Sequence, residues 1–152
     1  MNQAKDNVRH ILTNRKARHE YLVLETIEVG IALVGTEVKS ARDGKITVQD
    51  AYASVENGEL FLHNLHISPF DKGNIHNHDP LRVRKLLARK KEIVKLEQKI
   101  NEKGLTLIPL QIYFLGPHLK IELGVCKGKK TYDKRQALKE RDVKREMERN
   151  RE

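Results

Sequence analysis

The chain has 152 residues, of which 34% are charged and only 5% aromatic, with no tryptophan. Its 30 Lys and Arg residues outnumber the 21 Asp and Glu residues, and the resulting formal charge of +9 attracts polyanions such as nucleic acid. The single cysteine excludes an intrachain disulfide, and no apolar run approaches the ~20 residues of a membrane-spanning helix. We therefore expect a cytoplasmic protein with no membrane partner.

The N-terminal part predicts a leader, a long strand and a helical turn, in that order. Residues 1–10 are mainly polar and have no signal-peptide character, and we expect residues 1–13 to form a flexible leader. From His19 to Leu33, apolar residues alternate with polar or opposite-face positions, which is typical of a strand. The polar segment from Thr36 to Gly44 has room for one helical turn that ends at the glycine.

The middle of the chain predicts a hairpin and then a long helix. Asn57-Gly58 separates two apolar stretches, and Asn-Gly is the preferred two-residue hairpin turn because both of its positions adopt positive φ. Residues 68–79 are expected to form a loop. We expect a helix that starts after Asp79 as N-cap, with Pro80 in its first turn, and stops at Gly104.

Two further strands follow, and together the elements indicate a small barrel. Alternating apolar residues occupy 110–114 and 119–125, on either side of the turn at 116–118. Several short strands and one long helix favour a mainly β fold, a barrel partly covered by a helix. We expect the barrel domain to span residues 14–126.

The composition changes after Cys126. Residues 127–152 contain 11 Lys and Arg against 6 Asp and Glu, which places +5 of the chain's +9 in this segment. Few apolar residues are present, so we expect a basic tail that is disordered until it binds a partner. The plain alternative is a solubilising tail with no partner.

One stretch at the start of this tail is typical of RNA binding. Five cations between Lys127 and Arg135 flank Tyr132, and cations pair with phosphates while a tyrosine ring stacks on an unpaired base. A second basic cluster lies at residues 14–19. Two further hypotheses stay open. One is a metal-dependent enzyme, because the sequence has a cluster of His76, His78 and Asp79 that His63 and His66 could join by folding. The other is a permanently bound ribosomal protein.

Four blocks of sequence carry a resemblance to a known family. They resemble the SsrA-binding protein family, the protein partners of transfer-messenger RNA (tmRNA), in order and spacing from about Asn14 onward. The blocks are residues 14–21 (NRKARHEY), 35–40 (GTEVKS), 79–87 (DPLRVRKLL) and 124–135 (GVCKGKKTYDKR). Ala41 departs from the leucine usual in the family, and the distal tail lacks a tryptophan that some members carry.

The resemblance implies a fold, partners and a function. It implies a six-stranded barrel of oligonucleotide-binding type with about three helices, no cofactor, no enzymatic activity and, we expect, a monomer. It implies that the body holds the tRNA-like domain of tmRNA. The tail would then enter the decoding centre and messenger channel of a stalled 70S ribosome, so that the complex rescues the ribosome by trans-translation.

The resemblance also implies roles for individual residues. RNA contact is implied for Asn14, Arg15, Arg18, His19, Tyr21, Glu28, Lys39, Leu87, Lys127, Lys129 and Lys130. Contact between the tail and the ribosome is implied for Tyr132, Asp133, Lys134 and Arg135.

Overall fold

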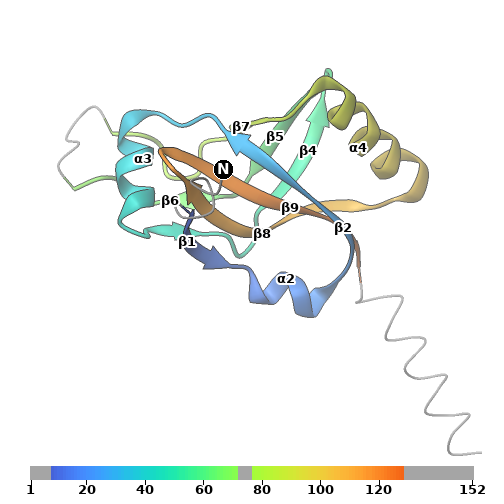
Figure 1. Cartoon of the computed structure of the whole chain (residues 1–152), viewed down its shortest axis with the longest axis horizontal. Helices are drawn as coiled ribbons and strands as arrows, with labels where there is room; N and C mark the ends of the chain where they lie inside the picture. The colour runs from blue at the N-terminus through green and yellow to red at the C-terminus, as the bar shows by residue number, and fades with distance from the viewer. Residues whose placement is uncertain (1–7, 72–76, 129–152) are drawn as a thin grey trace, which may run out of the picture.

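The computed structural model describes residues 8–71 and 77–128, and these form nine strands and three helices (Figure 1). In chain order the elements are β1 (Val8–Thr13), α2 (Arg15–Glu20), β2 (Tyr21–Ile31), α3 (Gly35–Arg42), β3 (Ile46–Thr47), β4 (Tyr52–Glu56), β5 (Glu59–His63), β6 (His66–Ile67), β7 (Arg84–Leu87), α4 (Lys90–Lys103), β8 (Thr106–Leu115) and β9 (His118–Gly128).

Six of the strands close into a ring of antiparallel pairs. The order is β8-β4-β5-β7-β2-β9, and β9 returns to pair with β8 along nearly its whole length. β1 pairs with the end of β8 that β4 leaves open, and β3 and β6 form a separate two-stranded sheet. This ring confirms the predicted six-stranded barrel of oligonucleotide-binding type with about three helices.

The core fills the ring because alternate side chains of each strand point inward. Leu60 and Leu62 of β5 belong to one core cluster with Ile121 and Leu123 of β9, and all four are fully buried. The predicted hairpin is confirmed: β4 and β5 pair in register across Asn57-Gly58, whose φ angles are 52° and 76°.

A second, smaller apolar cluster lies under α2, apart from the main core. Ala17 of this helix packs on Ile108, Leu110 and Cys126, which belong to β8 and β9. Gly124 makes this close packing possible, because a Cβ there would lie 2.7 Å from Leu110 Cδ1. The cluster fixes the position of α2 on the barrel.

Two segments differ from the expectations. Residues 8–13 belong to a strand rather than a flexible leader, because their backbone pairs with β8, about 100 residues away in sequence. The long helix starts at Lys90 instead of following Asp79, although it ends as predicted at Gly104, which has φ 63°. The reason is that residues 84–87 have a buried-exposed alternation of period two and complete the ring as β7.

The boundary of the expected tail also shifts. β9 continues through Lys127 and Gly128, which pair with the start of β2, so these two residues belong to the sheet. Residues 129–152 lie outside the described residues. Within residues 8–71 and 77–128, no helix is long and apolar enough to cross a membrane.

Candidate nucleic-acid interface

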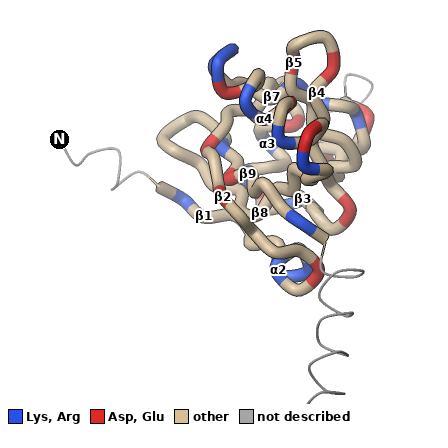
Figure 2. Tube along the Cα trace, turned by 90° about the vertical axis from the view of Figure 1, so that its right-hand side faces the viewer, with Lys and Arg blue, Asp and Glu red and all other residues tan. Residues whose placement is uncertain are grey.

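The helix α2 presents cations to solvent because its single buried side chain is small. Ala17 faces the barrel, while Arg15, Arg18 and His19 are exposed. Figure 2 shows the basic residues of this short helix on the outside of the molecule. Arg18 and His19 stand in the last turn, where a positive charge interacts favourably with the helix dipole.

The end of β9 lies beside this helix. Tyr21 pairs with Gly128 and Leu22 pairs with Lys127, so the exposed Lys127 comes next to the start of β2. Arg18 is close enough to Cys126 to influence its thiol: burial raises the pKa of Cys126 to about 11, against the smaller opposing effect of the Arg18 charge. The structure therefore brings together what we call the α2 surface, defined by Arg15, Arg18, His19, Tyr21 and Lys127.

Asn14 has a structural role in this arrangement. Its side chain is only 4% exposed, and its Oδ1 accepts a hydrogen bond from the Ala17 N–H as the N-cap of α2, at 3.1 Å. Its Nδ2 donates to the Pro109 carbonyl at 2.9 Å. Both polar atoms of Asn14 are thus engaged within the protein, and the residue ties α2 to β8.

Glu28 and Leu87 lie in a second group, toward the opposite end of β2. Glu28 lies seven positions after Tyr21 along the strand, which corresponds to roughly 23 Å. The Tyr113 hydroxyl donates a hydrogen bond to Glu28, and burial together with this carboxylate raises the pKa of Tyr113. The candidate residues therefore do not form one continuous patch.

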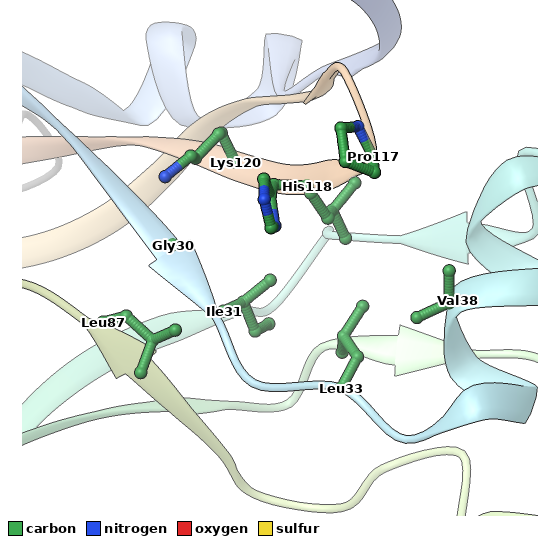
Figure 3. A pocket seen from close by; sticks show the side chains of 9 residues that line it. Gly30, Ile31, Leu33, Val38, Leu87, Pro117, His118 and Lys120 are labelled. Atoms are coloured by element: carbon green, nitrogen blue, oxygen red, sulfur yellow. The ribbon is translucent and has the colours of Figure 1, made fainter.

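An open hollow of about 210 Å³ adjoins this second group (Figure 3). Leu87, which is 51% exposed, forms one wall, and His118 and Lys120 of β9 supply polar groups opposite. Gly30 forms part of the floor, where a Cβ would come within 3.3 Å of the Leu87 Cβ. We call Glu28, Leu87, His118 and Lys120 the β2-end surface.

His118 and Lys120 were not among the residues singled out from the sequence. The signal was present, because Leu119, Ile121 and Leu123 alternate as the buried residues of β9 and leave the even-numbered positions facing outward. The sequence does not show that these positions lie near Leu87 in space. They do so because β2 pairs with both β7 and β9 at Gly30.

Lys39 projects from α3, with its Nζ 5.4 Å from the centre of the Phe70 ring. The helix that carries it is held in place by Glu37, which is fully buried. Glu37 Oε1 accepts hydrogen bonds from the Val34 N–H at 2.9 Å and from Arg82 Nη2 at 2.5 Å. Its second oxygen accepts one from Arg84 Nε.

The fully buried Arg84 completes this network. Its Nη1 donates to the Leu65 carbonyl at 2.6 Å, and its Nη2 donates to the Pro80 carbonyl at 3.1 Å. Burial would raise the pKa of Glu37, but the hydrogen bonds from Arg82, Val34 and Arg84 outweigh it, so the pKa lies below its ordinary value. The acidic residue of the GTEVKS block and the second arginine of the DPLRVRKLL block are therefore partners inside the fold.

The structure gives two histidines of the metal hypothesis, His78 and His63, other partners. His78 Nδ1 lies 2.8 Å from the Thr36 hydroxyl and its Nε2 lies 2.8 Å from the Ile67 carbonyl. His63 Nε2 lies 2.7 Å from the Ser54 hydroxyl. His76 lies outside the described residues, and among the described ones no group of three His, Cys, Asp or Glu side chains converges.

Several candidate residues fall in the part of the chain that the structure leaves undescribed. They are Lys129, Lys130, Tyr132, Asp133, Lys134 and Arg135.

Comparison with known proteins gives concordant matches over almost the whole chain. The model of the family described as SmpB protein matches residues 11–152. An SsrA-binding protein of Desulfitobacterium hafniense is 55% identical over 147 residues, covering 97% of this chain and 94% of that protein. An SsrA-binding protein of Clostridium perfringens is 53% identical over 149 residues, covering 98% and 95%.

A solved structure is similar as well. A chain from the structure described as "tmRNA-SmpB: a journey to the center of the bacterial ribosome" matches with a TM-score of 0.67 and 53% sequence identity. The match covers 81% of this chain and 87% of that chain.

Proposed function

The chain belongs to the SmpB protein family, and from this we propose that it is the RNA-binding adaptor of trans-translation. It binds the tRNA-like domain of tmRNA and delivers it to stalled ribosomes, where incomplete proteins are tagged. The observation that carries the proposal is the match to SsrA-binding proteins along 97% of the chain. The function is binding rather than catalysis, and because the ribosome is its place of action we assign the chain to the cytoplasm.

We assign phosphate contacts to the α2 surface. Arg15, Arg18 and Lys127 are exposed cations on a rigid support, and such side chains neutralise RNA phosphates and release their counterions. His19 adds a further donor, and Tyr21 adds an aromatic ring at the edge of the same surface. Asn14 contributes indirectly, because its hydrogen bonds position the helix that carries these cations.

We assign a different kind of RNA contact to the β2-end surface. The Glu28 carboxylate repels phosphate but accepts hydrogen bonds from base N–H groups or ribose 2′-hydroxyls. The exposed Leu87 offers an apolar contact, and Lys120 supplies a nearby positive charge. Lys39, on α3, would add a further phosphate contact. Two separated surfaces of different chemistry suit a folded RNA rather than an extended single strand.

We assign ribosome binding to the segment that follows β9. Tyr132 would stack on a base in the decoding centre, and Asp133, Lys134 and Arg135 would begin the contacts with the messenger channel. The excess of positive charge in residues 127–152 supports this assignment. In this organisation, the barrel that ends with β9 at Gly128 acts as the RNA-binding body, and residues 129–152 act as the basic tail.

The first test is equilibrium binding of the purified chain to the tRNA-like domain of tmRNA, with elongator tRNA as competitor, at two salt concentrations. We expect binding that survives competition, because the two surfaces recognise a shape and not charge alone. Equal binding of both RNAs that disappears at higher salt would contradict the proposal. It would favour a permanently bound ribosomal protein.

A matched pair of variants tests the α2 surface. Replacement of Arg15 and Arg18 by alanine should weaken binding to the tRNA-like domain and lower the slope of log K against log salt by about 2, since each phosphate contact contributes ~0.7–0.9. Replacement of Lys95 and Lys103 on α4 by alanine changes the net charge equally and should have a smaller effect. Equal losses of affinity in both variants would show that the α2 cations act only through the net charge of the protein and not through specific phosphate contacts.

Truncation separates the two halves of the proposal. A chain that ends at Gly128 should still bind the tRNA-like domain but should fail in a reconstituted tagging assay on stalled ribosomes. A chain that ends at Arg145 should retain more tagging activity. Full tagging by the chain that ends at Gly128 would refute the adaptor mechanism.

A further inference from the structure

A second open hollow lies between α2 and the strands β4 and β8, and its lining suits a flat aromatic ring. It has a volume of about 170 Å³, below the ~300–1,000 Å³ of pockets for drug-sized ligands. Two tyrosines, Tyr21 and Tyr52, contribute to its walls, and Thr106 of β8 lies in the lining with Gln49 and Asp50. We call it the Tyr52 hollow.

The Tyr52 ring is held ready as a stacking platform. It lies parallel to the ring of His63, its cross-strand neighbour on β5, with the ring centres 5.0 Å apart and the planes inclined by 14°. The Ser54 hydroxyl, 2.7 Å from His63 Nε2, holds the histidine in turn. The hollow lies on the β8 side of β4, opposite to β5 and His63, so Tyr52, which belongs to its lining, can offer its other ring face there. Tyr52 remains 41% exposed.

The polar groups of the hollow suit the edge of a base and exclude a phosphate. The Gln49 amide offers both a donor and acceptors, and the Asp50 carboxylate offers acceptors for base N–H groups. The carboxylates of Asp50 and Glu20 in the lining repel an anion, so the phosphates of a bound nucleotide must lie outside. Lys16 lies at the rim of the hollow, with its Nζ 3.5 Å from Asp50 Oδ1. This ion pair is exposed and contributes little stability, so Lys16 is able to leave Asp50 for a phosphate.

We propose that the Tyr52 hollow takes one unpaired base of an RNA, stacked on Tyr52, while its flanking phosphates meet the cations of α2. The occupant follows from this combination of a free aromatic face, hydrogen-bonding groups suited to a base edge, and exposed cations directly beside them. The inference rests on the proposed function, which supplies two RNAs that could donate the base: tmRNA and ribosomal RNA. It adds to that function a base-reading site distinct from the β2-end surface.

The experiment measures the affinity of the full chain for each RNA source separately. One arm uses the tRNA-like domain of tmRNA and the other uses 70S ribosomes without tmRNA. Tyr52→Ala should weaken binding by about 5- to 150-fold in the arm whose RNA donates the base, the range expected for loss of one base–aromatic stack. Tyr52→Phe keeps the ring and should stay within about threefold of the wild type. Val94→Ala, an exposed apolar residue on α4 outside the hollow, is the matched control.

The outcomes are distinguishable. A loss confined to one arm supports the inference and identifies the source of the base, whereas wild-type affinity of Tyr52→Ala in both arms overturns it. Gln49→Ala, an exposed change that leaves the Tyr52–His63 stack intact, should reduce affinity in the same arm and decides the matter if Tyr52→Ala is unstable. If the wild-type chain itself fails to prefer the tRNA-like domain over tRNA, the proposed function fails first, independently of Tyr52.

Discussion

Replacement of Glu37 by alanine should be one of the most destabilising single changes in this chain. The substitution leaves the fully buried Arg84 Nε without its acceptor and removes the partner of Arg82 and of the Val34 N–H. Removing one member of a buried ion pair typically costs ~3–5 kcal/mol, because an uncompensated charge stays in the interior. For a domain of this size that corresponds to a fall in Tm of roughly 10–20 °C.

The assay is thermal and urea unfolding followed by circular dichroism. Glu59→Ala is the matched control, because Glu59 forms an ion pair with Lys85 in which both side chains are about half exposed. Such surface pairs contribute ~0–1 kcal/mol, so the control should unfold close to the wild type. A double variant, Glu37→Leu with Arg84→Met, should recover much of the loss because it removes both charges. If Glu37→Ala unfolded within 2 °C of the wild type, on the order of the loss of a surface pair, the network would not be a structural support.

The same pair predicts a dependence on pH. Because the folded-state pKa of Glu37 lies below its ordinary value of 4.5, its ionised form adds stability that is complete above that value. The contribution is lost as the pH falls through the folded pKa. Unfolding curves measured from pH 6 to pH 3 should therefore show a steeper loss of stability in the wild type than in Glu37→Gln. Parallel curves would contradict the assignment.

Three further predictions concern the support of the α2 surface and the lysines in and after the end of β9. Asn14→Ala should lower the free energy of unfolding by about 2–4 kcal/mol in urea titrations, since it removes an N-cap and a buried hydrogen bond; an effect on RNA binding alone would contradict this. Gly124→Ala should lower the free energy of unfolding by about 1–3 kcal/mol, because the added methyl group overpacks the cluster under α2. An unchanged urea midpoint would show that the neighbouring side chains move to make room for it. Replacing three lysines by alanine should lower the salt slope of RNA binding by about 2–3, whereas an unchanged slope would remove them from the interface. These lysines are Lys127, Lys129 and Lys130.

Features determined by neighbouring residues could be predicted from the sequence. The Asn57-Gly58 turn and the stop of α4 at Gly104 depend on local preference for positive φ, and both are where the sequence predicts them. The start of α4 could not be located in this way. Residues 83–87 satisfy a helical period as well as a strand period, and Arg84 is buried because Glu37, 47 residues earlier, is there to receive it.

The candidate site shows the same division between local and distant determinants. Exposed cations such as Arg15 and Arg18 could be recognised from composition and order alone. The structural roles of Asn14 and Glu37 depend on Pro109 and Arg84, which are far away in sequence. A sequence motif by itself therefore does not show which of its residues hold the fold together and which contact RNA. The Tyr52–His63 stack could not be predicted from the sequence either, because it depends on the register in which β4 pairs with β5.

Closure of the ring by β9 also affects how the nascent chain can fold. β2 pairs with β9 from Tyr21 to Gly30 but with β7 at only two positions. Most of β2 therefore has no partner until β9 is synthesised, about 100 residues later. At ~5–20 residues per second, translation leaves that backbone edge unpaired for roughly 5–20 s. An open strand edge is a template for aggregation, and pairing across so long a separation is slow. Growing chains of this protein are therefore most vulnerable to association with one another, or to capture by a chaperone, in the seconds before the last strand of the ring emerges.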